Sequence, residues 1–249
     1  MKALLLAAGL GTRLRPLTDH RPKALVEVGG LPLLEIAVRR LKYFGFRELV
    51  VNIHHFGEQV IDFLAWHQNF GLNIALSDER DLLLDTGGAI RKARLLLGET
   101  DPFLVYNVDV VTSLDLPAMI EWHRQSGGLA TLAVRRRPTS RYFLFDPTGR
   151  LQGWRNKRSG EERWCAPAGN PGEVLEWAFS GIHVLDPAIF DLLPEQAVFS
   201  IVDAYLMLGR EHRILAYPHD HDDWVDCGKP DSLAAAAALL PNLKLANRL

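Results

Sequence analysis

A short glycine-containing segment near the amino terminus carries residue types that could bind phosphate groups. Residues 9–13 read Gly-Leu-Gly-Thr-Arg and directly follow an apolar run, and Lys23 comes ten positions after Arg13. Small residues let backbone N–H groups approach phosphate oxygens closely, and a guanidinium holds such oxygens with a planar fork of donors. The dinucleotide-binding fingerprint needs a third glycine where Leu14 stands, and the sequence has no G-x-x-x-x-G-K-[ST] loop. The turn and its two cations therefore predict a different kind of polyphosphate-binding loop.

Two aspartates far apart in the sequence are candidates for a metal site. Asp109 follows a predicted buried strand, and Asp226 lies in a short Trp-Val-Asp segment 117 positions later. A lone aspartate at a strand end is usually a turn former or a helix cap, so the residue types alone leave both interpretations open. Residues 219–223 read His-Asp-His-Asp-Asp and could be mistaken for a transition-metal site. We interpret that cluster as a solvated polar loop.

Composition and charge restrict the class of protein. The 249 residues suffice for one large domain or two small ones at roughly 100–200 residues per domain. A content of 48% apolar and 23% charged residues is typical of globular chains. The net charge of −2 gives no basic field, so we expect no nucleic-acid partner. No apolar run approaches the roughly 20 residues that span a bilayer, so we expect no membrane partner. Two cysteines are too few for a disulfide framework and favour a cytoplasmic location.

The first half of the sequence alternates short apolar runs with segments of helical periodicity, which is typical of βαβ units around a mostly parallel sheet. The predicted strands span residues 2–8, 48–53, 73–77 and 103–107, and the predicted helices span residues 33–44, 56–69 and 86–97. The apolar run 3–10 after Met1 and Lys2 also has the form of a short export signal. Arg13 and Arg15 fit a cleavage region poorly, so we interpret the run as a buried first strand.

The second half of the sequence contains strand-like segments separated by turns, which favours an antiparallel or mixed extension of the sheet. The predicted strands span residues 129–134, 142–145, 151–154, 177–184 and 213–217, and the predicted helices span residues 187–193, 200–208 and 230–240. The polar segment 155–176 is longer than a bare connection usually is. The sequence does not decide whether this segment is a functional flap or a mobile loop.

Residues 4–18 and 21–26 resemble the opening of the sugar-1-phosphate nucleotidylyltransferases. The resemblance continues, in family order, through residues 85–90, 107–109, 179–182 and 224–228. It is strongest to the short single-domain members, which transfer uridylyl groups to N-acetylmuramate 1-phosphate or guanylyl groups to mannose or heptose 1-phosphate. The resemblance implies one Rossmann-like, three-layer α/β domain over residues 1–249, with a mostly parallel central sheet, a smaller antiparallel or mixed extension and no β-helix domain. Residues 1–128 would form its nucleotide-binding half and residues 129–249 its sugar-binding half.

The same resemblance implies roles for individual residues on the nucleotide side. Residues that match the family's nucleotide contacts are Ala8, Gly9, Gly11, Thr12, Arg13, Asp85 and Gly88. Arg13, Lys23 and Asp109 match its catalytic positions. Asp109 and Asp226 match the aspartates that hold Mg²⁺, an ion that uses one or two protein carboxylates and completes its octahedron with phosphate oxygens and water.

The acceptor side carries the weaker part of the resemblance. Residues that match sugar-lining positions are Asn107, Tyr142, Ser180 and Gly181. The sequence also departs from the usual family pattern at three places. Val108 replaces a usual glycine, Ala24 replaces a usual proline, and residues 176–178 read Glu-Trp-Ala where some relatives have a Glu-Lys pair. We therefore expect Val108 to influence activity or substrate size.

The expected reaction joins a nucleoside triphosphate to a sugar 1-phosphate with release of pyrophosphate. The acceptor phosphate is itself an anionic nucleophile, so the chemistry needs no Ser-His-Asp arrangement, and none is evident in the sequence. Uridylyl transfer to an N-acetylmuramate-1-phosphate-like acceptor is favoured, with guanylyl transfer to mannose or heptose 1-phosphate as the alternative. A nucleotide-sugar-dependent glycosyltransferase has no need of the loop that grips a triphosphate. A non-catalytic nucleotide-sensing homologue remains open, and so does the choice between monomer and homodimer.

Overall fold

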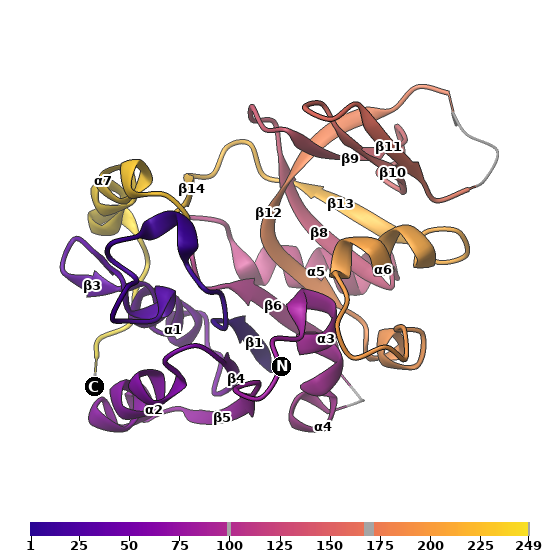
Figure 1. Ribbon diagram of the computed structural model, residues 1–249. Coiled ribbons are helices and arrows are strands. Elements are labelled where there is room, and N and C mark those ends of the chain that lie inside the picture. Colours follow the sequence, from indigo (N-terminus) through magenta and orange to yellow (C-terminus); the bar gives the residue numbers. More distant parts are fainter. Residues whose placement is uncertain (99–100, 167–171, 249) are drawn as a thin grey trace.

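Four parallel strands form the amino-terminal part of the central sheet in the computed structural model, which describes residues 1–98, 101–166 and 172–248 (Figure 1). They lie in the order β6 (Phe103–Asn107), β1 (Ala3–Leu6), β4 (Glu48–Ile53) and β5 (Asn73–Asp78). Leu4 and Leu5 are fully buried on opposite faces of the sheet, because successive side chains of a strand alternate. A strand buried on both faces must be apolar at every position, which explains the continuous apolar run of β1.

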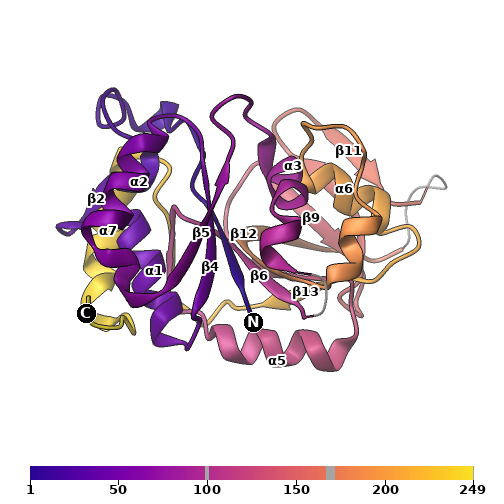
Figure 2. The same ribbon diagram turned by 90° about the horizontal axis from the view of Figure 1, so that it is seen from below.

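Helices cover both faces of these strands (Figure 2). On one face lie α1 (Leu33–Tyr43) and α2 (Gly57–Trp66), and on the other lie α3 (Asp85–Lys92) and α4 (Arg94–Leu97). In α1 the buried side chains Leu34, Val38 and Leu41 recur at helical spacing and form the stripe that packs on the sheet. Because the four strands are parallel, the loops that leave their carboxyl ends all lie at the same edge of the sheet.

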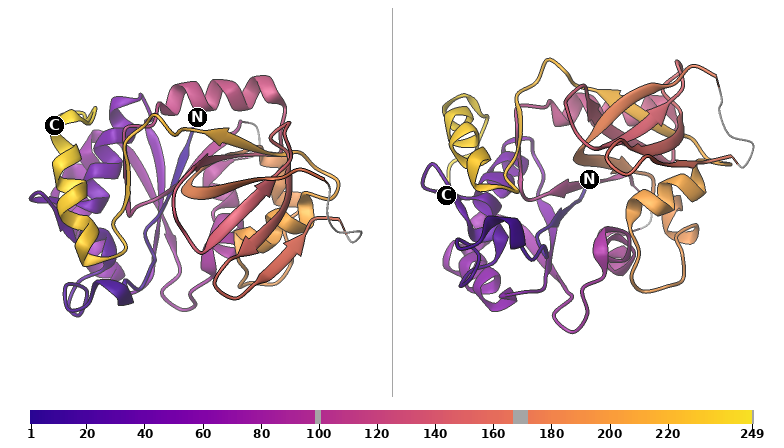
Figure 3. Two further views of the ribbon diagram at one scale, coloured as in Figure 1. Left: turned by 90° about the horizontal axis from the view of Figure 1, so that it is seen from above. Right: turned by 45° about the horizontal axis from the view of Figure 1, so that its top comes forward.

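The long strand β12 (Leu175–Leu185) joins the two parts of the sheet. It pairs antiparallel with β6, with β8 (Ala130–Arg135) and with β9 (Arg141–Phe145). Beyond β9 lie β10 (Leu151–Asn156) and β11 (Glu161–Trp164), and β13 (Ile214–Pro218) runs parallel to β8. Figure 3 shows these strands gathered on the opposite side of the molecule from the indigo amino-terminal segments. This arrangement confirms the predicted α/β class with an antiparallel and mixed extension.

A separate two-stranded ladder connects the end of β6 with the carboxyl-terminal region. β7 (Val110–Thr112) pairs antiparallel with β14 (Trp224–Asp226), and Val110 stands opposite Asp226. The chain then enters α7 (Pro230–Leu239), which packs near β14 on the same side as α1 (Figure 1). The remaining short elements are the 3₁₀ turns Thr12–Leu14, Lys23–Leu25, Gln68–Gly71, Pro187–Asp191 and Leu240–Asn242, and the strands β2 (Glu27–Val28) and β3 (Leu31–Pro32).

Helix α5 (Leu116–Ser126) is the largest element that the sequence analysis missed. Its start carries two ordinary signals, because the side chain of Asp115 accepts a hydrogen bond from the Ala118 N–H at 3.0 Å and a proline occupies the first turn. Its buried face includes His123, whose ring pairs with the Thr131 hydroxyl at 2.9 Å. A histidine on the apolar face weakened the helical pattern.

The segment 155–176 is not one long loop. β10 extends through Asn156, and β11 pairs with it antiparallel, so the prediction of a loop across this segment is wrong for that part. Arg155 links the strands further by ion pairs of 2.6 Å to Glu162 and Glu176. Residues 167–171 of the predicted loop lie outside the described residues.

Helix boundaries otherwise follow the predictions closely. The predicted helix 86–97 is divided at Ala93 into α3 and α4, and the helix predicted for 200–208 is α6 (Ile201–Leu208). Within the described ranges, the structure contains no helix with the length and apolar character that crossing a bilayer requires.

Candidate active site

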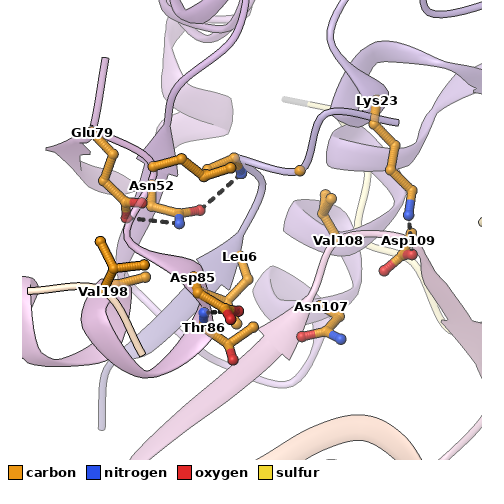
Figure 4. A pocket seen from close by; sticks show the side chains of 14 residues that line it. Leu6, Lys23, Asn52, Glu79, Asp85, Thr86, Asn107, Val108, Asp109 and Val198 are labelled. Carbon is orange, nitrogen blue, oxygen red and sulfur yellow. Dashed lines mark hydrogen bonds and ion pairs between the residues drawn. The ribbon is translucent and has the colours of Figure 1, made fainter. Parts of the chain in front are cut away.

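A cavity of about 440 Å³ opens at the carboxyl edge of β1, β4, β5 and β6 (Figure 4). Its position agrees with the rule that open α/β sheets bind ligands beyond the carboxyl ends of their strands. The residues that line it are Leu6, Ala8, Gly9, Lys23, Asn52, Glu79, Leu83, Asp85, Thr86, Ala89, Asn107, Val108, Asp109 and Val198. We call this space the first cavity.

The predicted phosphate loop forms one wall of the first cavity. Gly11 has φ +65°, and a Cβ atom at this position would lie 2.8 Å from the Thr18 methyl carbon and 3.1 Å from the Lys23 Cβ atom. The Thr18 hydroxyl also donates a hydrogen bond to the Gly11 carbonyl at 2.8 Å. Glycine is therefore required by both the left-handed backbone and the close approach of Lys23.

Asn52, at the end of β4, holds the start of the phosphate loop. Its Oδ1 atom accepts hydrogen bonds from the backbone N–H groups of Ala7 at 2.5 Å and Ala8 at 3.1 Å. Its Nδ2 atom donates to the Glu79 carboxylate at 2.9 Å, as Figure 4 shows. The sequence analysis missed both residues. The only signal for Asn52 was a buried polar residue inside an otherwise apolar strand.

Two carboxylates face the end of the first cavity that lies away from Lys23 (Figure 4). Glu79 is only 1% exposed, and burial raises the pKa of its carboxyl group. Asp85 is exposed, has φ +57° and accepts a hydrogen bond from the Thr86 N–H at 2.6 Å. The predicted residue Asp85 thus lines the cavity together with a carboxylate that the sequence analysis did not identify.

The two glycines that follow Asp85 and Thr86 pack against another part of the chain. The Gly87 N–H donates to the Phe199 carbonyl at 3.0 Å, and a Cβ atom on Gly87 would collide with the Phe199 ring. A Cβ atom on Gly88 would collide with the Ala197 carbonyl. This packing explains the glycine pair and brings Val198 to the cavity rim. Gly88 is buried and is not among the lining residues, so its predicted contact with the base stays a prediction.

Lys23 and Asp109 meet at the other end of the first cavity. The Lys23 ammonium group forms an ion pair with the Asp109 carboxylate, and the two side chains are 13% and 17% exposed (Figure 4). The backbone N–H of Cys227 donates to the Asp109 carbonyl at 2.8 Å, which places Asp226 directly beside Asp109. The structure therefore brings together two aspartates that the sequence separates by 117 positions.

A second cavity of about 710 Å³ lies on the Asp226 side of this carboxylate pair. Its lining is rich in cations and comprises Arg13, Arg137, Pro138, Thr139, Ser140, Arg141, Phe143, Trp154, Phe179, Val202, Asp226 and Lys229. A Cβ atom on Gly228 would lie 2.6 Å from the Arg13 Nη2 atom and 2.7 Å from an Asp226 carboxylate oxygen. Arg13 and Asp226 thus converge on Gly228. Arg13 lines this second cavity, whereas Lys23 lines the first.

The four residues predicted on the acceptor side are placed differently from one another. Asn107 lines the first cavity, and Gly181, with φ +77°, packs so closely that its Cβ atom would lie 2.8 Å from the Asn107 amide nitrogen. Ser180 is fully buried, with its hydroxyl 2.7 Å from the His219 Nε2 atom. Tyr142 lines neither cavity. Its hydroxyl accepts a hydrogen bond from the Thr139 N–H at 3.0 Å and donates one to the Arg137 carbonyl at 3.1 Å. The side chains of Ser180 and Tyr142 therefore support neighbouring segments.

Four of residues 219–223 are exposed or half-buried, as a solvated polar loop requires, and His219 is the exception. It is 3% exposed, and burial lowers the pKa of its imidazole to about 4, so the ring is neutral near pH 7. Its Nδ1 atom lies 3.6 Å from Asp222 and has no hydrogen-bond partner, so Ser180, His219 and Asp222 resemble a Ser-His-Asp arrangement in residue type only. The buried Ser180 hydroxyl cannot reach a substrate, so this arrangement is part of the core. Among the residues the structure describes, no three His, Cys, Asp or Glu side chains are grouped to hold a metal ion.

Comparison with known proteins assigns the family. A family model described as nucleotidyl transferase matches residues 2–242. The chain belongs to the nucleotidyl transferase family. It is 34% identical over 239 residues to the N-acetylmuramate alpha-1-phosphate uridylyltransferase of Neisseria meningitidis serogroup B, and the alignment covers 96% of this chain and 98% of that protein. The resemblance to the sugar-1-phosphate nucleotidylyltransferases is thereby confirmed.

The chain is also similar to a relative with another named specificity, and a solved structure shares its fold. The chain is 29% identical over 236 residues to a probable mannose-1-phosphate guanylyltransferase of Oryza sativa subsp. japonica, which covers 92% of this chain and 62% of that protein. A putative glucose-1-phosphate thymidylyltransferase from Bacillus anthracis, crystallised in complex with a sucrose, superposes with a TM-score of 0.79 at 22% identity. That match covers 100% of this chain and 98% of the other.

Val108, at the position where the resemblance leads us to expect a glycine, is part of the wall of the first cavity. Its side chain is 3% exposed and lines the first cavity between Lys23 and Asn107, and its N–H donates to the Leu6 carbonyl at 3.2 Å. The isopropyl group therefore occupies volume at the cavity wall that a glycine would leave open.

The Asn52–Glu79 hydrogen bond makes the stability of this nucleotidyl transferase testable by pH. In Asn52→Asp a second carboxylate replaces the amide that lies 2.9 Å from Glu79, and repulsion raises the pKa of both groups above the unfolded values. The variant therefore loses free energy of unfolding in full at pH values above both raised pKa values. This loss becomes smaller as the pH falls and the carboxylates take up protons. We expect the free energy of unfolding at pH 7 to fall by about 3 kcal/mol or more, with a smaller deficit at pH 5.

Urea unfolding of wild type and variant at several pH values measures this effect. Asn73→Asp, at an exposed position on the next strand, is the matched control and should stay near wild type. A deficit for Asn52→Asp that does not change with pH would contradict the assigned contact.

Proposed function

We propose that this chain transfers a nucleoside monophosphate from a nucleoside triphosphate to a sugar 1-phosphate and releases pyrophosphate. The observation that carries the proposal is the position of the Lys23–Asp109 ion pair and Asp226 between two cavities. The first cavity has apolar walls and hydrogen-bonding groups at its far end, which suits a nucleoside. The second is lined by cations, which suits an anionic acceptor.

The favoured nucleotide is a uridine nucleotide. The support is the 34% identity to a uridylyltransferase that matches this chain along 98% of its own length. Guanylyl transfer is a second candidate because Glu79 and Asp85 both line the first cavity. Carboxylates accept hydrogen bonds, and guanine offers N–H donors at N1 and N2, whereas uracil offers one N–H donor.

The favoured acceptor resembles N-acetylmuramate 1-phosphate, which is the substrate named for the Neisseria relative. The second cavity supports an acceptor with strong negative charge. Four cationic side chains line it against the single carboxylate of Asp226, and they are Arg13, Arg137, Arg141 and Lys229.

Asp109 and Asp226 are the residues that would hold Mg²⁺. The donor set fits this ion, because Mg²⁺ in phosphate-transferring sites uses one or two carboxylates and takes its other ligands from substrate phosphates and water. Bound there, the ion would neutralise negative charge on the transferring phosphate groups.

The chain's own residues contribute positioning and charge. An oxygen of the acceptor phosphate forms a bond to the α-phosphorus while the bond from the α-phosphorus to the bridging oxygen of the β-phosphate breaks, and pyrophosphate leaves with that electron pair. Lys23 is held at the reaction centre by its ion pair with Asp109 and stabilises the charge that accumulates during transfer. Arg13 supplies a second cation from the other cavity. The phosphate loop, held by Asn52, fixes the nucleotide in line with the acceptor.

Pyrophosphate release tests the proposed function directly. UTP, GTP, dTTP, CTP and ATP would each be mixed with the 1-phosphates of N-acetylmuramate, mannose, heptose and glucose, with Mg²⁺ or with a chelator. We expect strong release with UTP and N-acetylmuramate 1-phosphate and none after chelation. Preference for GTP would replace the uridylyl assignment. No release from folded protein that still binds nucleotide would favour a nucleotide-sensing role.

Lys23→Ala tests the assignment of the reaction centre. Removing the ammonium group eliminates a charge that acts on the transferring phosphate, so we expect turnover to fall by about 100-fold or more without unfolding. Lys244→Ala removes an exposed lysine near the carboxyl terminus and should keep wild-type turnover. A folded Lys23→Ala variant with a near-normal rate contradicts the assigned role.

A further inference from the structure

Arg137 occupies a defined position at the wall of the second cavity. It follows β8, and its Nη2 atom donates to the Phe179 carbonyl on β12 at 3.2 Å. Its guanidinium carbon lies 4.5 Å from the centre of the Trp224 ring on β14. Phe179 directly precedes Ser180, and Trp224 lies two residues before Asp226. The guanidinium is therefore fixed between the strand that carries the Ser180–Gly181 turn and the strand that carries Asp226.

The charge of Arg137 is only partly compensated by the protein. Burial lowers the pKa of the guanidinium, and the nearby carboxylate of Asp226 opposes this effect. Its Nε atom is buried without a hydrogen-bond partner, and the hydrogen bond given for its guanidinium among the described residues goes to the uncharged Phe179 carbonyl. A partly desolvated cation that no carboxylate contacts directly costs free energy, and an anion bound in the cavity would recover part of it.

The other cations near the second cavity differ from Arg137. Arg13 already converges with Asp226 on Gly228, and Arg141 and Lys229 are exposed. The neighbouring Arg136 is exposed as well and has a carboxylate partner, Asp220, at 3.9 Å.

The adjoining part of β12 supplies no cation of its own. Residues 176–178 read Glu-Trp-Ala, and Glu176 is held by Arg155 at 2.6 Å and Lys157 at 2.5 Å. Trp177 and Ala178 are buried. A positive charge at this wall of the cavity therefore comes from Arg137.

We propose that Arg137 binds an anionic oxygen group of the acceptor and thereby places the acceptor beside Asp226. This inference rests on the proposed function for the identity of the acceptor, but the anion site itself follows from the geometry of Arg137. The group bound is the phosphate of the sugar 1-phosphate or a carboxylate carried by the sugar. A carboxylate is a planar oxyanion and a phosphate is a tetrahedral one, and a guanidinium can contact either with two N–H donors.

Steady-state kinetics of Arg137→Met test this proposal. Methionine keeps much of the packing on Trp224 and removes the charge. With UTP as the donor we expect the KM for the acceptor to rise about tenfold or more, which is the scale of one lost charge-assisted hydrogen bond. The KM for UTP should stay within about twofold, because UTP is placed in the other cavity. Arg136→Met is the matched control on the same loop and should behave as wild type.

The choice of acceptor separates the two sources of negative charge. If the KM rises equally for glucose 1-phosphate and N-acetylmuramate 1-phosphate, Arg137 binds the phosphate that both acceptors carry. If the KM rises for N-acetylmuramate 1-phosphate alone, Arg137 binds the carboxylate of that sugar. Arg137→Lys keeps the charge and should give intermediate values. Arg137→Gln repeats the neutral change if the methionine variant fails to fold. An unchanged KM for both acceptors in a folded neutral variant overturns the proposal.

Direct binding keeps this inference separable from the proposed function. Calorimetric titration of each sugar phosphate into wild type and Arg137→Met, both with UTP and a chelator present, measures binding in the absence of turnover. If wild type shows no turnover but the variant binds either sugar phosphate about tenfold more weakly, the proposed function fails and the anion site stands. Equal binding, or no binding of either sugar phosphate to wild type, overturns the anion site.

Discussion

The pairing of β7 with β14 is the constraint on which the candidate site depends. The Cys227 N–H donates to the Asp109 carbonyl at 2.8 Å, and Val110 stands opposite Asp226 in the ladder. This contact places the backbones of two aspartates from distant parts of the chain beside each other. It also brings the carboxyl-terminal segment onto the sheet edge where the phosphate loop ends. Asp109 lines the first cavity and Asp226 lines the second, so the proposed reaction centre between the cavities depends on this pairing.

The surrounding elements hold this centre rigidly from both sides. Beside the first cavity, Asn52 links the backbone at Ala7 and Ala8 to the buried carboxylate of Glu79. On the side of Asp226, the Trp224 Nε1 atom donates to the Ser180 carbonyl at 2.9 Å, which ties β14 to the Ser180–Gly181 turn. Buried polar contacts of this kind are satisfied in one arrangement only, so they fix the geometry of both cavities. Catalysis that relies on positioning requires such rigidity.

The sequence predicts local features well and long-range placement poorly. The four parallel strands and the glycine turn at Gly11 follow from apolar runs and from a backbone that only glycine adopts easily. Three-residue strands such as β7 and β14 have no periodicity to detect, and only the family resemblance paired Asp109 with Asp226. Ser180 is buried where the register of β12 against β8 shifts, between Phe179 and His183, and a sequence does not reveal such a shift. Arg137 was missed because its significance lies in its half-buried place between Phe179 and Trp224, where no described carboxylate contacts it directly, and this is a property of the folded chain.

A double-mutant cycle on Asp109→Asn and Asp226→Asn measures most directly whether the two carboxylates form one site. If the two carboxylates act as a unit, either single substitution removes the same contribution to turnover that the double substitution removes. Residues that act together in catalysis show such non-additive losses. Turnover of the two single variants and of the double variant should then agree within about tenfold, all at least about 100-fold below wild type. Fully additive losses, or a single variant with near-normal turnover, would show that the β7–β14 pairing does not create a shared reaction centre.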